Sequence, residues 1–198
     1  MKEYRIEQDF IGKMEVPSGV YYGIQTARAL ENFPITGYHL DGALINAMGI
    51  VKKASALANM EAGLLDERRG QAIVDAAQEV MEGKFNDQFM VDPIQGGAGT
   101  SINMNANEVI ANRAIEILGG KLGDYSLISP NSHVNMSQST NDSFPTALRI
   151  AILSKAGNLL QATEEVEKEL RLKSVEFDDV LKMGRSHLQD AVTLNGFE

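Results

Sequence analysis

Residues 139–170, STNDSFPTALRIAILSKAGNLLQATEEVEKEL, carry the strongest periodic pattern in the chain and decide its fold. Apolar side chains recur there in steps of four and three, which is the spacing of one narrow face of an α-helix. The positions of this apolar seam are Ile152, Ala156, Leu159, Thr163, Val166 and Leu170. We therefore predict one helix of about 30 residues, which at ~1.5 Å rise per residue is about 45 Å long.

The apolar seam needs a packing partner. A rod of this length cannot bury one of its faces against itself, and few apolar residues follow Leu170 in this sequence. Leu153 and Leu160 widen the seam on the same helix. We expect its packing partners to be either other subunits or segments that follow residue 198.

Three shorter helical patterns precede the long helix. Asp41 is a residue type that caps helix starts and Gly63 is one that ends helices, so the apolar period between them predicts a helix. The other two predicted helices run from Asp66 to Gly83 and from Ile102 to Leu118. Residues 1–38 mix turn-forming and helix-forming stretches, and we expect a small mixed segment there. The predicted fold class is mainly α.

Composition and charge exclude several classes of partner. The 198 residues include 18 basic and 27 acidic side chains, and the net charge of -9 repels nucleic acid and anionic membrane surfaces. No cysteine is present, which excludes disulfides and thiolate chemistry. The first residues lack the apolar core of a signal peptide, and no stretch is long and apolar enough to span a bilayer. We expect a soluble, cytoplasmic protein.

The first of three polar clusters is GGAGTSINMNANE, residues 96–108. Its glycine turn delivers Thr100 to a helix start, where free N–H groups and a partial positive charge favour a carboxylate or phosphate. An ordinary capped turn explains the same residues, and the sequence leaves both interpretations open. For Asn103, Asn105 and Asn107, side-chain bonds to neighbouring loops are favoured over contacts with a ligand.

The second cluster, HVNMSQSTNDSFPT, begins at His133 and holds more hydroxyl and amide side chains than one helix cap needs. Ser139, Thr140 and Asn141 stand where the long helix should begin. An elaborate cap and a seat for an anionic ligand both fit this pattern. His133 and Asp142 fit equally well as structural hydrogen-bond partners.

The third cluster, KMGRSHLQDA at residues 182–191, groups Arg185, Ser186 and His187 after the long helix. A histidine beside a hydroxyl and an arginine can orient a dianionic substrate or transfer a proton near neutral pH. A lone histidine is more often a structural residue, so this cluster is also open to two interpretations. No set of residues shows metal-ligand spacing, and neither a metal nor another cofactor is expected.

Taken together and in this order, the three clusters resemble the aspartase/fumarase superfamily. In that family the segments GAGTSxNMNxNE, HVNxxQSTND and GRxHLQDA line the active site, and the resemblance covers essentially the whole chain. Fumarate hydratases share the architecture but usually have Gly-Ser-Gly-Thr-Gln in the first segment and Ser-Ser-Asn-Asp in the second. Residues 97–101 and 139–142 of this chain have the aspartase-like versions.

The resemblance implies a reaction, the reversible anti elimination of ammonia from L-aspartate to fumarate through a dianionic enediolate. Hydroxyls and helix starts suit the stabilisation of that charge, and a carboxamide and an imidazole would contact the substrate's amino group. The substrate-binding residues that the resemblance implies are Thr100, Ser139, Thr140, Asn141, Ser186 and His187. The family's catalytic base is a serine on a glycine-rich loop, and because this chain has no match to that loop, no catalytic residue is assigned in it.

Two departures from the family pattern accompany the matches. Ser186 stands where the family usually has threonine, and residues 193–198 do not follow the family's continuation. The chain therefore resembles a truncated or divergent member, and we expect the isolated 198 residues to be catalytically inactive. Two alternatives stay open, namely a fumarate hydratase and a folded assembly module without activity.

The resemblance also implies a domain organisation and an assembly. Residues 1–138 correspond to the family's N-terminal domain, and residues 139–198 correspond to the start of a central helical-bundle domain that is incomplete in this chain. Family members form homotetramers in which three subunits contribute to each active site. The expected partners are a small-molecule substrate, L-aspartate or fumarate, and further copies of the chain.

Overall fold

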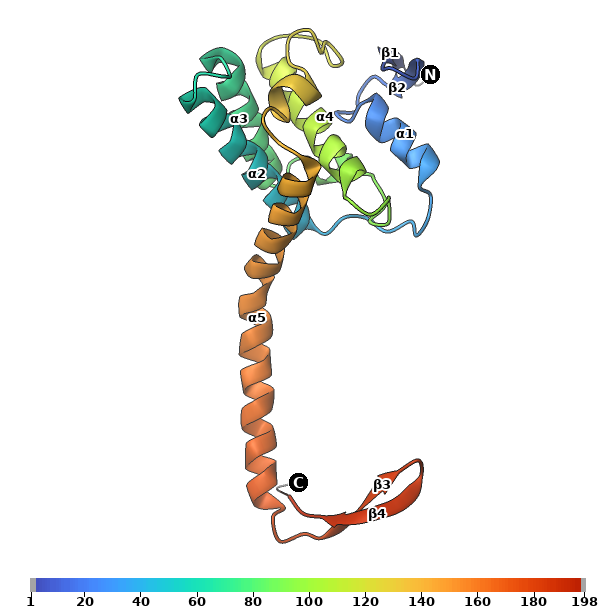
Figure 1. The fold of residues 1–198 in the computed structure, drawn as a ribbon, viewed down its shortest axis with the longest axis vertical. Coiled ribbons are helices and arrows are strands. Elements are labelled where there is room, and N and C mark those ends of the chain that lie inside the picture. Colours follow the sequence, from blue (N-terminus) through green and yellow to red (C-terminus); the bar gives the residue numbers. More distant parts are fainter. Residues whose placement is uncertain (1–2, 197–198) are drawn as a thin grey trace. The chain divides into compact units, whose positions relative to one another are not determined.

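A computed structural model describes residues 3–196 of the protein (Figure 1). Within this range the chain divides into two compact units, one up to Ile152 and the other from Leu153 onward. The sequence predicts a boundary between two family domains after residue 138. The division into compact units does not test that boundary, so it stays a prediction. Helices dominate the described chain, which confirms the mainly α fold class.

Within the described residues, the first unit contains two short strands, four complete α-helices, two short helices of other types and the start of a fifth α-helix. The elements up to residue 81 are β1 (Tyr4–Gln8), β2 (Lys13–Pro17), α1 (Ile24–Asn32), α2 (Gly42–Glu61) and α3 (Glu67–Met81). They are followed by the 3-10 helix η1 (Asn86–Gln88), α4 (Thr100–Ile117), the π-helix η2 (Pro130–Val134) and α5 (Thr140–Glu176). The strands β1 and β2 pair antiparallel, with Ile6 opposite Glu15.

Local capping chemistry places α2 and α3 where the sequence predicts them. The Asp41 carboxylate accepts a hydrogen bond from the Ala43 amide, and the Asp66 carboxylate accepts one from the Arg69 amide. At the end of α2, Gly63 adopts a φ of 72°, a left-handed conformation that glycine reaches without strain. The predicted helix boundaries are confirmed to within about two residues, the usual uncertainty of helix ends.

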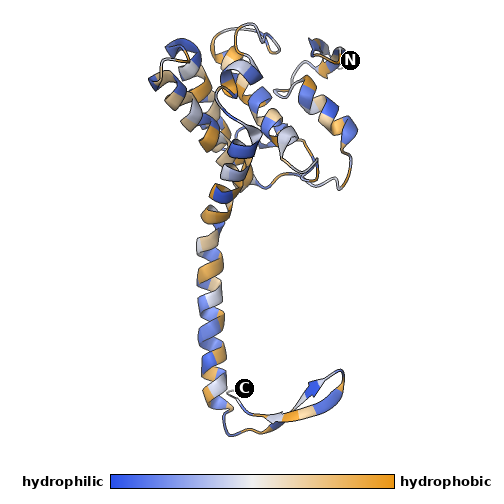
Figure 2. Cartoon of the chain, in the orientation of Figure 1, coloured by the Kyte–Doolittle hydropathy of each residue, from blue (hydrophilic) through white to orange (hydrophobic). Residues whose placement is uncertain are grey.

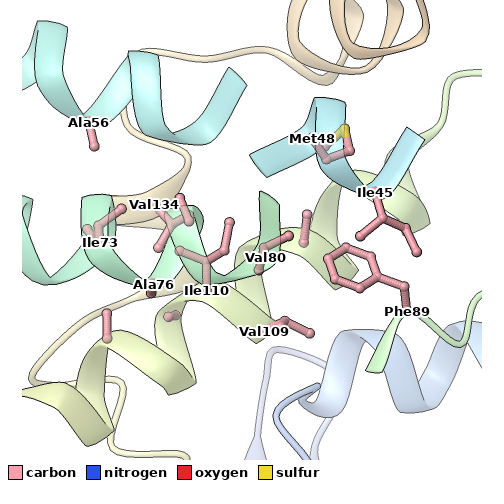
Figure 3. Close-up of a cluster of buried hydrophobic side chains, with 14 of the residues drawn as sticks. Ile45, Met48, Ala56, Ile73, Ala76, Val80, Phe89, Val109, Ile110 and Val134 are labelled. Atoms are coloured by element: carbon pink, nitrogen blue, oxygen red, sulfur yellow. The ribbon is translucent and has the colours of Figure 1, made fainter. Parts of the chain in front are cut away.

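The core of the first unit lies between α2, α3 and α4 (Figure 3). Helix α3 packs against both α2 and α4, and the start of α5 covers part of the same core through Ala147. The side chains that are at most 2% exposed include Ile45, Met48, Ile73, Val80, Phe89, Val109 and Ile110. Each buried side chain of this size contributes about 1.5–3 kcal/mol, so this cluster is the main source of stability in the first unit.

The second unit contains the rest of α5 and an antiparallel hairpin of β3 (Lys182–Ser186) and β4 (Gln189–Leu194). Hydrophobic residues recur along α5 (Figure 2), and the seam residues Leu159, Val166 and Leu170 are 69%, 58% and 65% exposed. The sequence predicted the helix and its seam but not the hairpin, since residues 182–194 show no clean alternation of apolar and polar side chains. Among the described helices, none has the length and apolar character needed to cross a membrane.

Candidate functional site

The candidate site begins where the starts of α4 and α5 approach each other. Gly99 precedes α4 with a φ of 77°, and a side chain at this position would overlap the ring of Phe144 in the first turns of α5. Only glycine satisfies both the backbone conformation and the close approach. The glycine turn of the first polar cluster therefore brings the two helix starts into contact.

Buried hydrogen bonds tie the two helix starts together. The Asn103 carboxamide donates from Nδ2 to the Thr140 hydroxyl oxygen at 3.1 Å. Its Oδ1 accepts from the Ser143 hydroxyl, also at 3.1 Å. Asn103 is 1% exposed and Ser143 is 2% exposed, so the bond between them lies away from solvent, whereas Thr140 is only partly buried.

The predicted site residues on these helix starts differ in what they do. Ser139 acts as a cap, because its hydroxyl oxygen accepts a hydrogen bond from the Asn141 amide at 3.1 Å. Thr140 is partly buried and accepts from Asn103. The exposed side chains of Thr100 and Asn141 have no hydrogen-bond partner within the described residues. The capping interpretation thus holds for Ser139 but leaves the side chains of Thr100 and Asn141 facing solvent.

The structure gathers Thr100, Ser139, Thr140 and Asn141 at adjoining helix starts, whereas Ser186 and His187 belong to the second unit. There, Ser186 ends β3 and His187 lies in the hairpin turn. His187 has a φ of 51°, and both side chains are exposed.

Sequence reasoning missed Lys52, which lies under the second polar cluster. This lysine of α2 is fully buried, and its ammonium donates to Asn135 Oδ1 at 2.9 Å and to Gln138 Oε1 at 2.8 Å. Desolvation lowers the pKa of Lys52 to about 7. The only signal in the sequence is its position four residues after Met48 and four before Ala56, which places it on the apolar face of α2.

Asn105 and Asn107 of α4 bond to neighbouring loops, as predicted. Asn105 donates to the Gln88 carbonyl at 2.9 Å and accepts from the Met90 amide at 3.1 Å. Asn107 donates to Asn135 Oδ1 at 3.2 Å. Both side chains are fully buried, and their partners lie in the loops that flank α4. Ligand contact is not required to explain either residue.

His133 fits the structural interpretation that the sequence left open. Its Nδ1 accepts a hydrogen bond from the Ser129 amide at 2.8 Å, which closes the π-helical turn before the site. Burial lowers the pKa of His133, so the neutral ring that can accept this bond is favoured. Asp142, in contrast, is exposed at the start of α5.

A cavity of about 510 Å³ lies elsewhere in the first unit, and none of the six predicted site residues lines it. The carboxylates that line this cavity already accept hydrogen bonds from other parts of the protein. Asp9 accepts two hydrogen bonds from Arg28, and Glu108 accepts from the backbone amides that begin α1. Across residues 3–196, no group of three or more His, Asp or Glu side chains could hold a metal ion.

The fold and the site together define a class of protein: a mainly helical chain with hydroxyl and amide groups concentrated at adjoining helix starts, which suits a small anion. Comparison with known proteins agrees with this class. A family model described as lyase matches residues 12–195, and the chain belongs to this lyase family.

Several relatives of known name are similar to this chain. An aspartate ammonia-lyase from a Bacillus species is 65% identical over 97% of the chain, and one from Bacillus subtilis is 62% identical over 98%. A class II fumarate hydratase from Halobacterium salinarum is 52% identical over 96%. A crystal structure from Brucella melitensis described as fumarate lyase:delta crystallin has a TM-score of 0.84 and 48% identity, covering 98% of this chain and 46% of that chain. The chain spans about 40% of the length of the curated relatives, 41% for both Bacillus proteins.

Proposed function

We propose that this chain provides part of the substrate site of an aspartate ammonia-lyase, which eliminates ammonia from L-aspartate reversibly to give fumarate. The two Bacillus relatives of that name support the proposal, since they are 65% and 62% identical to this chain over the aligned residues. The aspartase-like residues at 97–101 and 139–142 support it against the hydratase alternative.

The observation that carries the proposal is the hydrogen bond between the side chains of Asn103 and Thr140. It holds the starts of α4 and α5 together, so hydroxyls from two helices are available to one carboxylate. Proton removal from Cβ of aspartate creates a dianionic enediolate, and preorganised donors stabilise that charge without having to reorganise. We assign Thr100, Ser139 and Thr140 to this role.

The remaining assignments follow the family resemblance. We propose that Ser186 joins the donors to the enediolate, and that Asn141 and His187 contact the substrate's amino group with Thr100 nearby. No described residue is proposed as the base, because the chain has no match to the family's serine loop. We accordingly expect no turnover by the 198 residues alone.

The exposed seam on α5 supports an assembly of several copies of the chain. Leu159, Val166 and Leu170 are all more than half exposed, which is costly for a row of apolar side chains on one helix face. We propose that this face packs against helices of other copies, in the homotetramer that the resemblance implies. Location in the cytoplasm stays a prediction from the sequence.

The second candidate is a fumarate hydratase. The Halobacterium salinarum relative of that name, 52% identical, favours it. The two reactions share fumarate and differ in the group that is eliminated, so substrate choice separates them. A third alternative, a folded module without activity, predicts no turnover in any context.

The test uses a hybrid protein in which residues 1–192 of this chain precede the remaining segment of the Bacillus subtilis relative. Fumarate release is measured from L-aspartate and from L-malate, with the 198-residue chain as a parallel sample. We expect turnover of aspartate by the hybrid, and a loss of roughly 10²–10³ in kcat for Thr140→Ala. Turnover of malate alone would favour the hydratase, and no turnover of either substrate would contradict the proposal.

A further inference from the structure

Lys52 is an unusual residue for the interior of a helical domain. It is fully buried, and within residues 3–196 its two hydrogen-bond acceptors are neutral amide oxygens, with no carboxylate pairing. Burial of a cation without a counter-ion is costly. Stability therefore does not explain this lysine.

Both partners of Lys52 belong to the loop that leads into α5. Asn135 and Gln138 flank Ser137, which has a φ of 59°, an uncommon conformation for a residue with a side chain. Such strain persists only where surrounding contacts fix the backbone. The two bonds from Lys52 fix the chain on both sides of the strained residue. The second of these bonds is to Gln138, which directly precedes Ser139.

Asn135 Oδ1 joins its own loop to two helices. It accepts from Lys52 of α2 at 2.9 Å, and from Asn103 and Asn107 of α4 at 3.1 Å and 3.2 Å. Asn107 Oδ1, in contrast, is a buried oxygen without a partner in the described part of the chain. The hydrogen bonds around Asn135 therefore do not satisfy every buried polar atom near it.

The same network determines the direction of the Thr140 hydroxyl. Asn103 uses its two Nδ2 hydrogens on Asn135 and Thr140, and its Oδ1 on Ser143, so its carboxamide has one favourable orientation. Thr140 Oγ1 is therefore an acceptor toward Asn103. Its single hydrogen is not used in a hydrogen bond within the described residues, so it is available to donate outward.

We propose that Lys52 and Asn103 are positioning residues for the candidate site: Lys52 fixes the loop that begins α5, and Asn103 turns the Thr140 hydroxyl into a donor for the substrate carboxylate. This inference rests on the proposed lyase function. Neither residue needs to touch the substrate.

The first test redirects the hydroxyl with almost no change in shape. In Asn103→Asp the side chain loses its donors, so the Thr140 hydroxyl rotates to donate inward to the new carboxylate. In the Bacillus hybrid we expect kcat for aspartate to fall roughly 10²–10³, as for the loss of one donor to the enediolate. Adding Thr140→Val should then cost little more, because the donor is already lost.

Asn105→Asp is the matched control. Asn105 is equally buried on the same helix and also donates to an oxygen, the Gln88 carbonyl, but it has no bond to Thr140. We expect it to lower thermal stability about as much as Asn103→Asp while kcat changes by less than about threefold. Equal losses of kcat in the two variants would overturn the role of Asn103.

The second test does not depend on activity. In the 198-residue chain, Lys52→Met keeps an unbranched side chain that is one heavy atom shorter but removes both bonds to the loop. We expect amide hydrogen exchange at residues 136–141 to accelerate about tenfold or more, while amides of α3 keep their protection. Lys53→Met, which removes a bond to Gln78 of α3 instead, should leave the loop unchanged.

The outcomes separate this inference from the proposed function. Unchanged exchange in Lys52→Met would overturn the role of Lys52, whatever the hybrid's activity. If the unsubstituted hybrid turns over neither aspartate nor malate, the proposed function and the role of Asn103 in it fail together. Accelerated exchange would then still support Lys52 as the residue that fixes the loop.

Discussion

The two compact units treat apolar side chains in opposite ways. In the first unit Phe89 and Ile110 are at most 1% exposed within the core of α2, α3 and α4. In the second unit Leu159 and Val166 on α5 are 69% and 58% exposed. The first unit is stabilised by its own interior, whereas the second presents a row of exposed apolar side chains.

The largest expected difference between the units concerns folding stability. Phe89→Ala removes a buried ring and leaves a cavity, so we expect the free energy of unfolding to fall by about 3–5 kcal/mol. Leu159→Ala removes an exposed side chain of the second unit and should change it by less than about 0.5 kcal/mol. Denaturant unfolding followed by circular dichroism measures both. Similar losses for the two variants would break the comparison.

The next largest effect is a dependence of folding stability on pH, which comes from Lys52 in the first unit. The pKa of Lys52 is about 7 in the folded protein against an ordinary value of 10.5. Between these two values the unfolded chain holds a proton that the folded chain has lost, so unfolding takes up a proton and stability rises with pH. Below about pH 7 both states are protonated and this contribution is constant.

We expect a slope of at most about 1.4 kcal/mol per pH unit from Lys52 between roughly pH 8 and 9.5. Lys52→Met should remove this slope, whereas Lys53→Met should retain it. The measurement is denaturant unfolding at a series of pH values. A slope that is identical in the protein and in Lys52→Met would mean that another group is responsible.

A substitution in the seam of α5 is expected to have the smallest effect on the free energy of unfolding. Its effect on the association of copies of the chain should be large. Val166→Glu places a charge on the exposed face of α5, which should change the free energy of unfolding by less than about 0.5 kcal/mol. The same charge should prevent packing of this face against another copy. Light scattering over a concentration series measures the mass. A chain that is strictly monomeric before substitution would contradict the proposed assembly.

Much of the fold could be predicted because helix signals are local. Asp41, Asp66 and Gly63 mark helix ends by their own capping chemistry, and the structure confirms each of them. The spacing of apolar residues predicted the long helix α5. The β3–β4 hairpin was missed, since a two-stranded hairpin with exposed faces leaves no regular pattern in the sequence.

The candidate site could be predicted only in part. The polar clusters indicated Thr100, Ser139, Thr140 and Asn141, because an excess of hydroxyls and amides at a helix start is visible in the sequence. Lys52 was not found, because one basic residue on a helix is ordinarily exposed. Its burial depends on how α2 packs, which no local pattern records.

The sequence by itself determined the helices, their caps, the order of the polar clusters and the family resemblance, since all of these depend on neighbouring residues or on short motifs. Only the tertiary structure decided that Lys52 bonds to Asn135, 83 residues away, and that Asn103 bonds to Thr140, 37 residues away. Hydrogen bonds of this kind form where helices pack, and side-chain packing brings together residues that have no relation along the chain.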